Sequence, residues 1–274
     1  MPSALLPDRG VVSIAGADAA TFLQGLVSND VALAEQGPIW AALLTPQGKW
    51  LADFFILRAD GSLLLDCDRA QAAFLVQHLS RFRLRAKVAI GDESAAWNVL
   101  AGWGDATQPQ GPGGRDPRLA EAGWRVLRPA GSAAGEAGAD AYDLHRLRLG
   151  LPDGARDLES GKTVLLEAGF DELNGVSWTK GCYMGQELTA RTKYRGLVKR
   201  RLVPVAVEGP RPEPGTPALL DGAEVGAIRS GRGQRAMALL RLEAIRAGRA
   251  IACGEATLRP DVPGWMVLPQ ADAA

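Results

Sequence analysis

The stretch IWAALLTPQGKWLADFFILRADGSLLLDC, residues 39–67, decides the fold. Its apolar runs at 39–44, 50–57 and 62–67 are separated by two short turn sequences, PQG and ADG. Apolar runs of this length, bounded by turns that contain Gly and Pro, are typical of strands joined by hairpins. We therefore expect a three-stranded antiparallel meander over this stretch.

Helices and further strands flank the meander. A short strand at 11–14 precedes a helix whose apolar face includes Leu23, and a longer helix is expected at 69–82, followed by a strand at 86–90. Helices interleaved with hairpins favour an α+β fold over a doubly wound parallel sheet.

Two changes in composition suggest domain boundaries. Residues 102–123 are rich in Gly, Pro and Gln and predict a linker or exposed loop, with a boundary near residue 110. A strand at 124–127 and a helix at 140–149 follow, and after residue 200 the chain has short apolar runs typical of a small β-barrel or sandwich. We expect three domains, at 1–110, 111–200 and 201–274.

Composition limits the functional classes. The 274-residue chain has a formal net charge of zero, so only local charge patches can attract a polyanion. Its three cysteines are far apart and form no C-x-x-C pair, which argues against a disulfide framework or a self-contained zinc site. No secretory leader or membrane-spanning run is evident, so we expect a soluble cytoplasmic protein without a membrane partner.

The run KGCYMGQE, residues 180–187, contains the candidate reactive group. Cys182 lies between glycines, close to Lys180 and just before a segment that can start a helix. A nearby ammonium and free helix N–H groups both favour a thiolate over a thiol. Such a thiolate permits nucleophilic attack, redox exchange or ligation of a shared metal, and no motif pairs it with His78 or His145.

A basic segment follows, with six Lys or Arg residues between Arg191 and Arg201 and no acidic residue from 188 to 207. It predicts either a solvated surface or the rim of a pocket for a polyanion, such as a folate glutamate tail or RNA phosphate. If the segment is helical, Glu187 and Arg191 are four residues apart and pair with each other.

Asn29 and Asp30 lie at the expected exit of the first helix. They are compatible with a plain C-terminal turn. They are also compatible with polar groups that point into a cavity and bind a flat heterocycle through paired donors and acceptors. Their position in the sequence does not distinguish the two.

Several motifs together resemble a known family. They are FLQGLVSNDV at 22–31, TPQGK at 45–49, RLRLGLP at 146–152, and KGCYMGQELTAR at 180–191 with YRGLVKR at 194–200. They resemble the folate-binding YgfZ family, within the superfamily of the glycine-cleavage T-protein, an aminomethyltransferase. The branch that they resemble most is related to mitochondrial iron–sulfur assembly factors.

The resemblance implies an α+β fold of three domains around a central folate-sized hole. Two are sheet-and-helix domains, one of them ferredoxin-like, and the third is a C-terminal β-barrel. Tetrahydrofolate or a derivative would bind in the hole. The matching motifs supply candidate contacts for it at Asn29, Asp30, Arg148, Tyr183, Gln186, Glu187, Arg191, Tyr194 and Arg195.

The resemblance also implies a role in iron–sulfur cluster assembly or repair that supports enzymes which modify tRNA. Cys182 would be the central residue, as a redox nucleophile or as one ligand of a cluster shared with an assembly or client protein, and Lys180 would lower its pKa. The alternatives are a folate-dependent aminomethyl or one-carbon transferase and an RNA-contacting module that binds tRNA.

Two departures from the T-protein pattern disfavour the transferase. Arg148 stands where aminomethyltransferases carry the glutamate that grips the pterin. No counterpart of the catalytic aspartate is evident, and Asp66 and Asp68 are the nearest candidates. An accessory role therefore fits the sequence better than a catalysed transfer.

Overall fold

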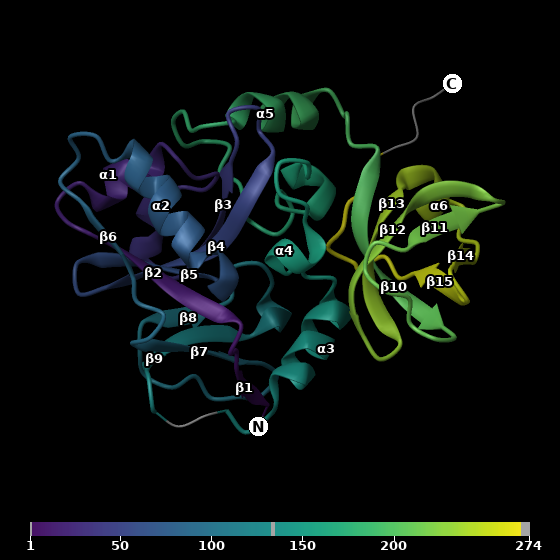
Figure 1. The fold of residues 1–274 in the computed structure, drawn as a ribbon, viewed down its shortest axis with the longest axis horizontal. Coiled ribbons are helices and arrows are strands. Elements are labelled where there is room, and N and C mark those ends of the chain that lie inside the picture. The colour runs from purple at the N-terminus through teal and green to yellow at the C-terminus, as the bar shows by residue number, and fades with distance from the viewer. Residues whose placement is uncertain (1, 133–134, 270–274) are drawn as a thin grey trace.

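A five-stranded antiparallel sheet forms the first part of the computed structural model, which describes residues 2–132 and 135–269 (Figure 1). The expected meander is present, because consecutive strands pair through the two predicted turns. The N-terminal strand then pairs with the last strand of the meander. In spatial order the sheet contains β3 (Ile39–Leu44), β4 (Trp50–Ala59), β5 (Ser62–Asp68), β2 (Arg9–Ala15) and β6 (Ala89–Asp92).

Alternation along β4 explains how this sheet packs. Phe54 and Ile56 face the helices α1 (Ala19–Gln24) and α2 (Ala72–Phe82). Phe55 and its neighbour two residues on, Leu57, face the opposite way and join the core shared with a second sheet. Both faces are therefore covered, which explains why the meander is apolar almost throughout.

The second sheet has four strands and combines segments that are distant in sequence. Its order is β1 (Ser3–Leu5), β7 (Trp97–Gly102), β9 (Trp124–Pro129) and β8 (Gly113–Arg115). Because β7 and β9 pair directly, a domain boundary at residue 110 would cut through this sheet.

Two local predictions are wrong. The stretch 102–123 is not only a loop, because β8 lies within it and pairs with β9. The strand expected at 86–90 begins at Ala89, because the chain first turns through Leu84, whose φ is 43°, and through a hydrogen bond from the Val88 N–H to the Ala86 carbonyl.

The C-terminal part is a closed six-stranded barrel, as expected for the segment after residue 200. Two of its strands are only four and three residues long, too short to give a sequence pattern. A short helix, α6 (Leu242–Arg246), follows one barrel strand. The barrel order is β10 (Arg200–Glu208), β13 (Arg235–Arg241), β12 (Ala223–Arg232), β11 (Pro217–Leu220), β14 (Ile251–Cys253) and β15 (Ala256–Pro260).

Three helices connect the sheets to the barrel (Figure 1). The helix α3 (Ala139–Leu149), expected at 140–149, contacts both β1 and the barrel strands. The short α4 (Gly154–Asp157) lies between β4 and the barrel strand β12. Helix α5 (Gln186–Tyr194) follows the cysteine motif and leads to β10. The observed architecture confirms an α+β fold with a C-terminal β-barrel.

Candidate functional site

Cys182 lies on an exposed loop, residues 177–185, which we call the Cys182 loop. The other two cysteines, Cys67 and Cys253, are buried. The loop ends at Gly185, whose φ is 81° and where an added Cβ would lie 2.5 Å from the Thr45 carbonyl oxygen, so only glycine fits. This close approach clamps the loop on the β3–β4 turn and leaves the Cys182 thiol facing solvent.

Lys180 holds the base of the Cys182 loop. Its Nζ donates to the carbonyls of Gln24, Val27 and Asn29, each at 2.7 Å, and lies 5.1 Å from the centre of the Tyr183 ring. These bonds use all three ammonium protons. Burial lowers the pKa of Lys180 to about 8, so the ammonium remains the major form at pH 7. Lys180 thus ties the loop to the turn after α1, and it has no free donor for Cys182.

Tyr183 and Gln186 shape the turn into α5. The Tyr183 backbone N–H donates to Gln186 Oε1 at 3.2 Å, and the Tyr183 side chain is buried. Burial raises the pKa of the Tyr183 hydroxyl to about 12, so it is a neutral group at physiological pH. Both residues therefore fix the conformation of the loop that presents Cys182.

The other candidates on α5 and just after it face solvent. Glu187, Arg191, Tyr194 and Arg195 are all exposed, and Tyr194 meets the edge of the Trp178 ring at a centroid distance of 6.1 Å. The ion pair expected between Glu187 and Arg191 is not among those formed by the described residues. These side chains lie on an outer surface.

Asn29 and Asp30 belong to a structural turn. The Asn29 amide donates to the carbonyls of Trp40 and Asn174, both at 2.8 Å, which uses its two N–H groups. Asp30 caps a 3-10 helix, η1 (Val31–Glu35), by accepting a hydrogen bond from the Ala32 N–H. Of the two interpretations of this pair, the turn agrees with these contacts.

Arg148, a predicted folate contact, and Arg146 point in opposite directions from α3. Arg148 is exposed, whereas Arg146, one helical half-turn earlier, is 2% exposed. Arg146 bonds Asp143 and Asp157 at 2.7 Å and the Ser230 hydroxyl at 2.6 Å. The buried arginine of α3 is therefore the one that reaches the centre of the molecule.

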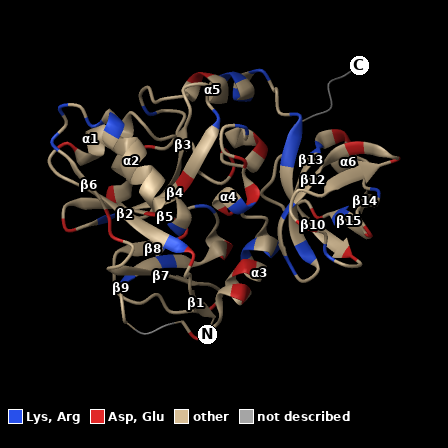
Figure 2. Ribbon diagram, viewed as in Figure 1, with Lys and Arg blue, Asp and Glu red and all other residues tan. Residues whose placement is uncertain are grey.

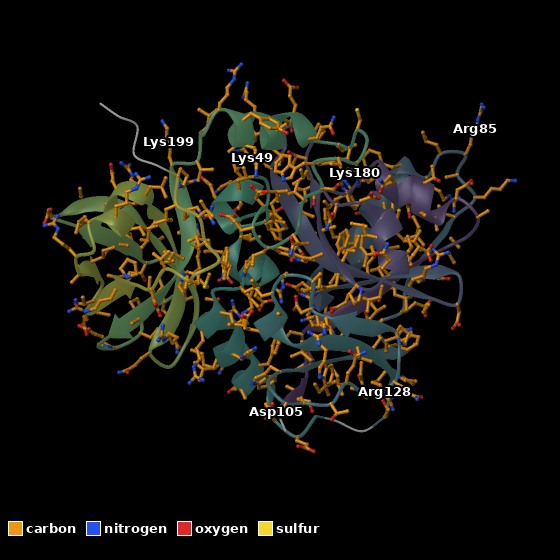
Figure 3. All side chains as sticks on the ribbon, turned by 180° about the vertical axis from the view of Figure 1, so that it is seen from behind. Lys49, Arg85, Asp105, Arg128, Lys180 and Lys199 are labelled. Atoms are coloured by element: carbon orange, nitrogen blue, oxygen red, sulfur yellow. The ribbon has the colours of Figure 1, made fainter. Side chains whose placement is uncertain are left out.

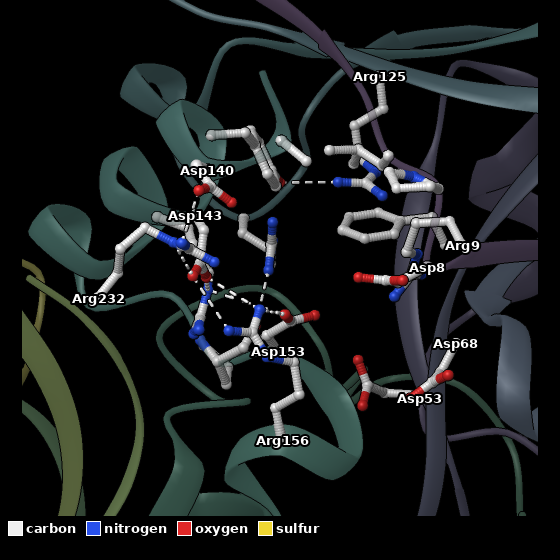
Figure 4. A pocket seen from close by; sticks show the side chains of 18 residues that line it. Asp8, Arg9, Asp53, Asp68, Arg125, Asp140, Asp143, Asp153, Arg156 and Arg232 are labelled. Carbon is white, nitrogen blue, oxygen red and sulfur yellow. Dashed lines mark hydrogen bonds and ion pairs between the residues drawn. The ribbon is translucent and has the colours of Figure 1, made fainter. Parts of the chain in front are cut away.

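A central cavity of about 260 Å³ opens where the two sheets, α3 and α4 approach the barrel (Figure 4). Lys, Arg, Asp and Glu gather along α3 and α4 beside it (Figure 2). Its wall includes the aromatic rings of Phe55 and Tyr142. Six aspartates and six arginines also line it: Asp8, Asp53, Asp68, Asp140, Asp143, Asp153, Arg9, Arg118, Arg125, Arg146, Arg156 and Arg232.

On the barrel side of the cavity, the charges converge on Asp143. Its carboxylate accepts hydrogen bonds from Arg146, Arg156 and Arg232, the last of which belongs to the barrel strand β12 and also pairs with Asp140. Burial alone would raise the pKa of Asp143, but the bonds and charges of these arginines outweigh it and lower the pKa below its ordinary range. This cluster fastens the barrel to α3.

On the sheet side, Asp66 is the centre. It is 1% exposed and pairs with Arg9 and Arg125, each at 2.6 Å. Arg125 also donates to the Tyr142 hydroxyl at 2.8 Å, and its guanidinium lies 4.1 Å from the centre of the Phe55 ring. Asp66 therefore orients two cavity arginines without itself lining the cavity.

Asp53 differs from Asp143, the other buried carboxyl of the cavity, because its hydrogen bonds come from neutral groups. The indole N–H groups of Trp40 and Trp50 donate to its two oxygens at 3.0 and 3.1 Å. Burial raises the pKa of Asp53. Arg118 is paired with Asp116 and leaves Asp53 without an ion-pair partner among the described residues.

The cavity residues fit tetrahydrofolate in part. The Phe55 ring and the Asp53 carboxyl are groups that hold a flat heterocycle with N–H donors. Arg156 and Arg232 are half-exposed and could meet a carboxylate tail, but both are already ion-paired. An anionic tail would have to exchange with Asp143 or Asp153 to reach them.

None of the candidate folate contacts or cysteine-motif residues predicted from the sequence lines this cavity, but Asp68, a candidate for the catalytic aspartate, does. Asp53, Phe55, Arg118 and Arg125, which line the cavity, were not predicted as site residues. One signal was available: Asp53 and Arg125 interrupt the apolar runs WLADFFIL and WRVL, and a charge inside a buried strand requires a partner. No metal site was found either, because the described residues contain no three His, Cys, Asp or Glu side chains placed to hold an ion together.

The fold defines the class of protein. A solved structure of glycine cleavage system aminomethyltransferase T from Bartonella henselae superposes with a TM-score of 0.76 at 16% identity, and the match covers 98% of this chain and 86% of that one. The expected T-protein-like fold is thereby confirmed. The model of the CAF17 C-terminal β-barrel domain matches residues 199–268, which span the barrel.

Two curated relatives cover nearly the whole chain. The mouse (Mus musculus) protein named iron–sulfur cluster assembly factor IBA57, mitochondrial, is 36% identical over 95% of this chain and 84% of its own length. The human (Homo sapiens) protein of that name is 35% identical with the same coverage. The chain belongs to the IBA57 family of iron–sulfur cluster assembly factors. The resemblance to that branch is confirmed, and the family is IBA57 rather than the related YgfZ.

The comparisons correct the expected location. A cytoplasmic protein was predicted from the absence of an evident leader, but the relatives that match the chain are named mitochondrial proteins. The prediction of a cytoplasmic protein is therefore wrong. Within the part of the chain that the structure describes, no helix combines the length and the hydropathy needed to cross a bilayer.

Proposed function

We propose that this chain takes part in iron–sulfur cluster assembly by ligating a cluster through Cys182, with the remaining ligands supplied by an assembly or client protein. The exposure of Cys182 carries the proposal, because the other two cysteines are buried. The relatives are named iron–sulfur cluster assembly factors, which supports the same role.

Ligation by Cys182 is a ligand exchange without net redox change. The Cys182 thiol gives its proton to solvent and its sulfur bonds to an iron atom of the cluster. The thiolate that leaves that iron takes up a proton. One thiolate cannot hold a cluster alone, since clusters of this kind use about four ligands. Cys182 therefore provides one part of a site that a second molecule completes.

The geometry disfavours the alternative of a folate-dependent aminomethyl or one-carbon transferase. Such an enzyme needs a general base within hydrogen-bonding reach of the reacting nitrogen. Asp53 is a buried cavity carboxyl held by neutral donors, and both its oxygens already accept indole N–H groups. Cys182 lies outside the cavity, so a cavity reaction would not explain the cysteine motif.

A cell-based assay tests the role of Cys182. A strain that lacks its own copy of the gene is supplied with the wild-type chain, with Cys182→Ala or with Cys253→Ala as a control that also removes one thiol. We expect the wild type and C253A to restore iron–sulfur enzyme activity, including that of enzymes that modify tRNA, and C182A to fail at equal protein level. Full rescue by C182A would contradict the proposal.

We further propose that tetrahydrofolate or a derivative binds in the central cavity and not at Cys182. The support is the Phe55 ring beside the Asp53 carboxyl, with Trp40 and Trp50 bonded to the latter. Titration with tetrahydrofolate should change the tryptophan fluorescence, and Asp53→Asn should weaken binding while C182A leaves it unchanged. Binding that depends on Cys182 but not on Asp53 would contradict this assignment.

A further inference from the structure

The segment between α5 and β10, residues 195–199, forms one wall of a surface groove that the cluster and folate proposals do not use. We call it the connector groove. Its volume is about 690 Å³, and the barrel residues 241–246 form the opposite wall. An adjoining hollow of about 400 Å³ shares Gly196, Val198 and Pro269 with it. The groove and the hollow therefore lie next to each other at the end of α5.

The groove and hollow are basic. Six cationic side chains line them against four carboxylates. Four of the cations pair with the four acids: Lys193 with Asp171, Arg200 with Glu167, Arg201 with Glu172 and Arg241 with Glu243. Lys199 has no ion pair among the described residues and projects from the surface (Figure 3). The lining cations are Lys193, Lys199, Arg200, Arg201, Arg241 and Arg246, and the acids are Glu167, Asp171, Glu172 and Glu243.

Exposed apolar side chains lie on the same surface. Leu197 is 47% exposed and lines the groove, and Val267 is 67% exposed and lines the hollow. Tyr194, at the end of α5, is 75% exposed. Exposed apolar groups that gather inside a ring of charges mark surfaces that bind other proteins.

A buried donor at the floor of the hollow lacks a partner. Arg201 is 3% exposed, and its Nη2 lies 2.8 Å from Glu172 Oε1. Its Nε is buried without a hydrogen-bond partner in the described part of the molecule. A buried N–H that makes no hydrogen bond is costly, so Arg201 depends on its ion pair with Glu172.

We propose that the connector groove docks an acidic segment of a partner protein, with glutamate or aspartate side chains on Lys199 and its neighbours and an apolar side chain against Leu197. The inference rests on the proposed function only for the identity of this partner as an assembly or client protein. Because the segment 195–199 leads directly from α5, a partner seated here lies against the helix that follows the Cys182 loop.

The lining favours a polypeptide over RNA. No aromatic side chain is among the described residues that line the groove or the hollow. Leu197 and Val267 offer aliphatic contacts, whereas proteins that bind single-stranded RNA use aromatic faces for the bases. An acidic peptide with interspersed leucines satisfies both the cations and the apolar groups.

Fluorescence anisotropy tests the groove with three labelled probes: a synthetic peptide that alternates pairs of glutamate with leucine, the same peptide with glutamine in place of glutamate, and a single-stranded RNA of equal length. We expect the acidic peptide to bind best and to weaken as salt is raised. The double variant Lys199→Glu/Arg241→Glu should lose about tenfold in affinity, since each reversed charge removes a surface ion pair and adds repulsion.

Two further variants test the apolar contact and control for the change in net charge. Leu197→Ser changes no charge and should weaken the acidic peptide about threefold or more through lost apolar contact. Arg83→Glu/Arg85→Glu makes the same charge change far from the groove, where Figure 3 places Arg85, and should bind as the wild type does. Thermal melting checks that each variant folds.

The outcomes separate this proposal from the cluster proposal. Equal binding of the glutamine peptide, or unchanged binding by K199E/R241E, overturns the acidic-peptide assignment. Tighter RNA binding that the same double variant abolishes would assign the groove to nucleic acid instead. Cys182→Ala should not alter peptide affinity, so failure of the cluster role leaves this result intact, and the reverse also holds.

Discussion

The central cavity and the Cys182 loop use charge in opposite ways. In the cavity, all six arginines are ion-paired with aspartates, and several of these pairs are almost fully buried. On the surface that carries Cys182 and α5, Arg191 and Arg195 are exposed and have no ion pair with any described residue. Charge is buried and compensated in one region, and exposed and available in the other.

The difference follows from the cost of removing charge from water. A buried ion must be paired and hydrogen-bonded, so the cavity arginines are held in place by the fold before any ligand arrives. Exposed cations cost little and remain free to meet a partner. The cavity is therefore suited to fixed recognition of a small molecule, and the outer surface to association with another macromolecule.

The largest effect is expected at Asp66, the buried centre of the sheet-side cluster. Asp66→Asn keeps the shape of the side chain but leaves Arg9 and Arg125 with an uncompensated buried charge. We expect the free energy of unfolding in urea to fall by about 3–5 kcal/mol. Asp105→Asn, at an exposed position, should change it by less than about 0.5 kcal/mol. An equal loss of unfolding free energy in D66N and D105N would contradict the stated difference between buried and exposed charges.

An intermediate effect is expected at Asp143, which joins α3 to the barrel. Asp143→Asn should cost about 2 kcal/mol, because it weakens charge-assisted bonds from three arginines. The folded pKa of Asp143 lies below its ordinary value, so the carboxylate stabilises the fold above about pH 4 and this contribution is lost as the pH falls further. Urea titrations of the wild type and D143N from pH 7 to pH 3 measure the difference between their free energies of unfolding. This difference should narrow below about pH 4. A difference that stays constant with pH would contradict the lowered pKa of Asp143.

The smallest effect is expected on the outer surface. Arg191→Ala and Arg195→Ala should each change the free energy of unfolding by less than about 0.5 kcal/mol, because neither side chain has an ion pair to lose. Thermal melting of the single variants checks this. If either variant lowers the free energy of unfolding by more than about 1 kcal/mol, that side chain stabilises the fold and is not free to bind a partner.

The sequence predicted the fold better than the site. Apolar runs bounded by Gly and Pro turns located the meander and the barrel, because the longer strands each carry their own pattern. The motif at 180–187 located Cys182 for a similar reason, since its residues are adjacent in sequence. The cavity could not be found this way, because Arg9, Asp53, Arg125 and Arg232 come from separate strands that meet only in the folded chain.

A short motif does not specify where its side chains point, as Lys180 and Arg148 illustrate. Lys180 was expected to lower the pKa of Cys182, and its ammonium points toward three carbonyls of the turn after α1. Arg148 was expected in the folate site, but the helical period of α3 points Arg146 inward and Arg148 outward. Burial of one side chain and exposure of the other depend on the packing of α3 on the barrel.

Transfer of a [2Fe–2S] cluster to the purified chain tests the central claim most directly. A glutathione-ligated cluster is mixed anaerobically with the wild type, Cys182→Ala or Cys253→Ala, and cluster binding is followed by visible circular dichroism. We predict that the wild type and C253A acquire a protein-induced signal, because glutathione supplies the ligands that the chain lacks, and that C182A acquires none. An identical signal from C182A would contradict the claim that the exposed Cys182 thiolate is this chain's contribution to the cluster.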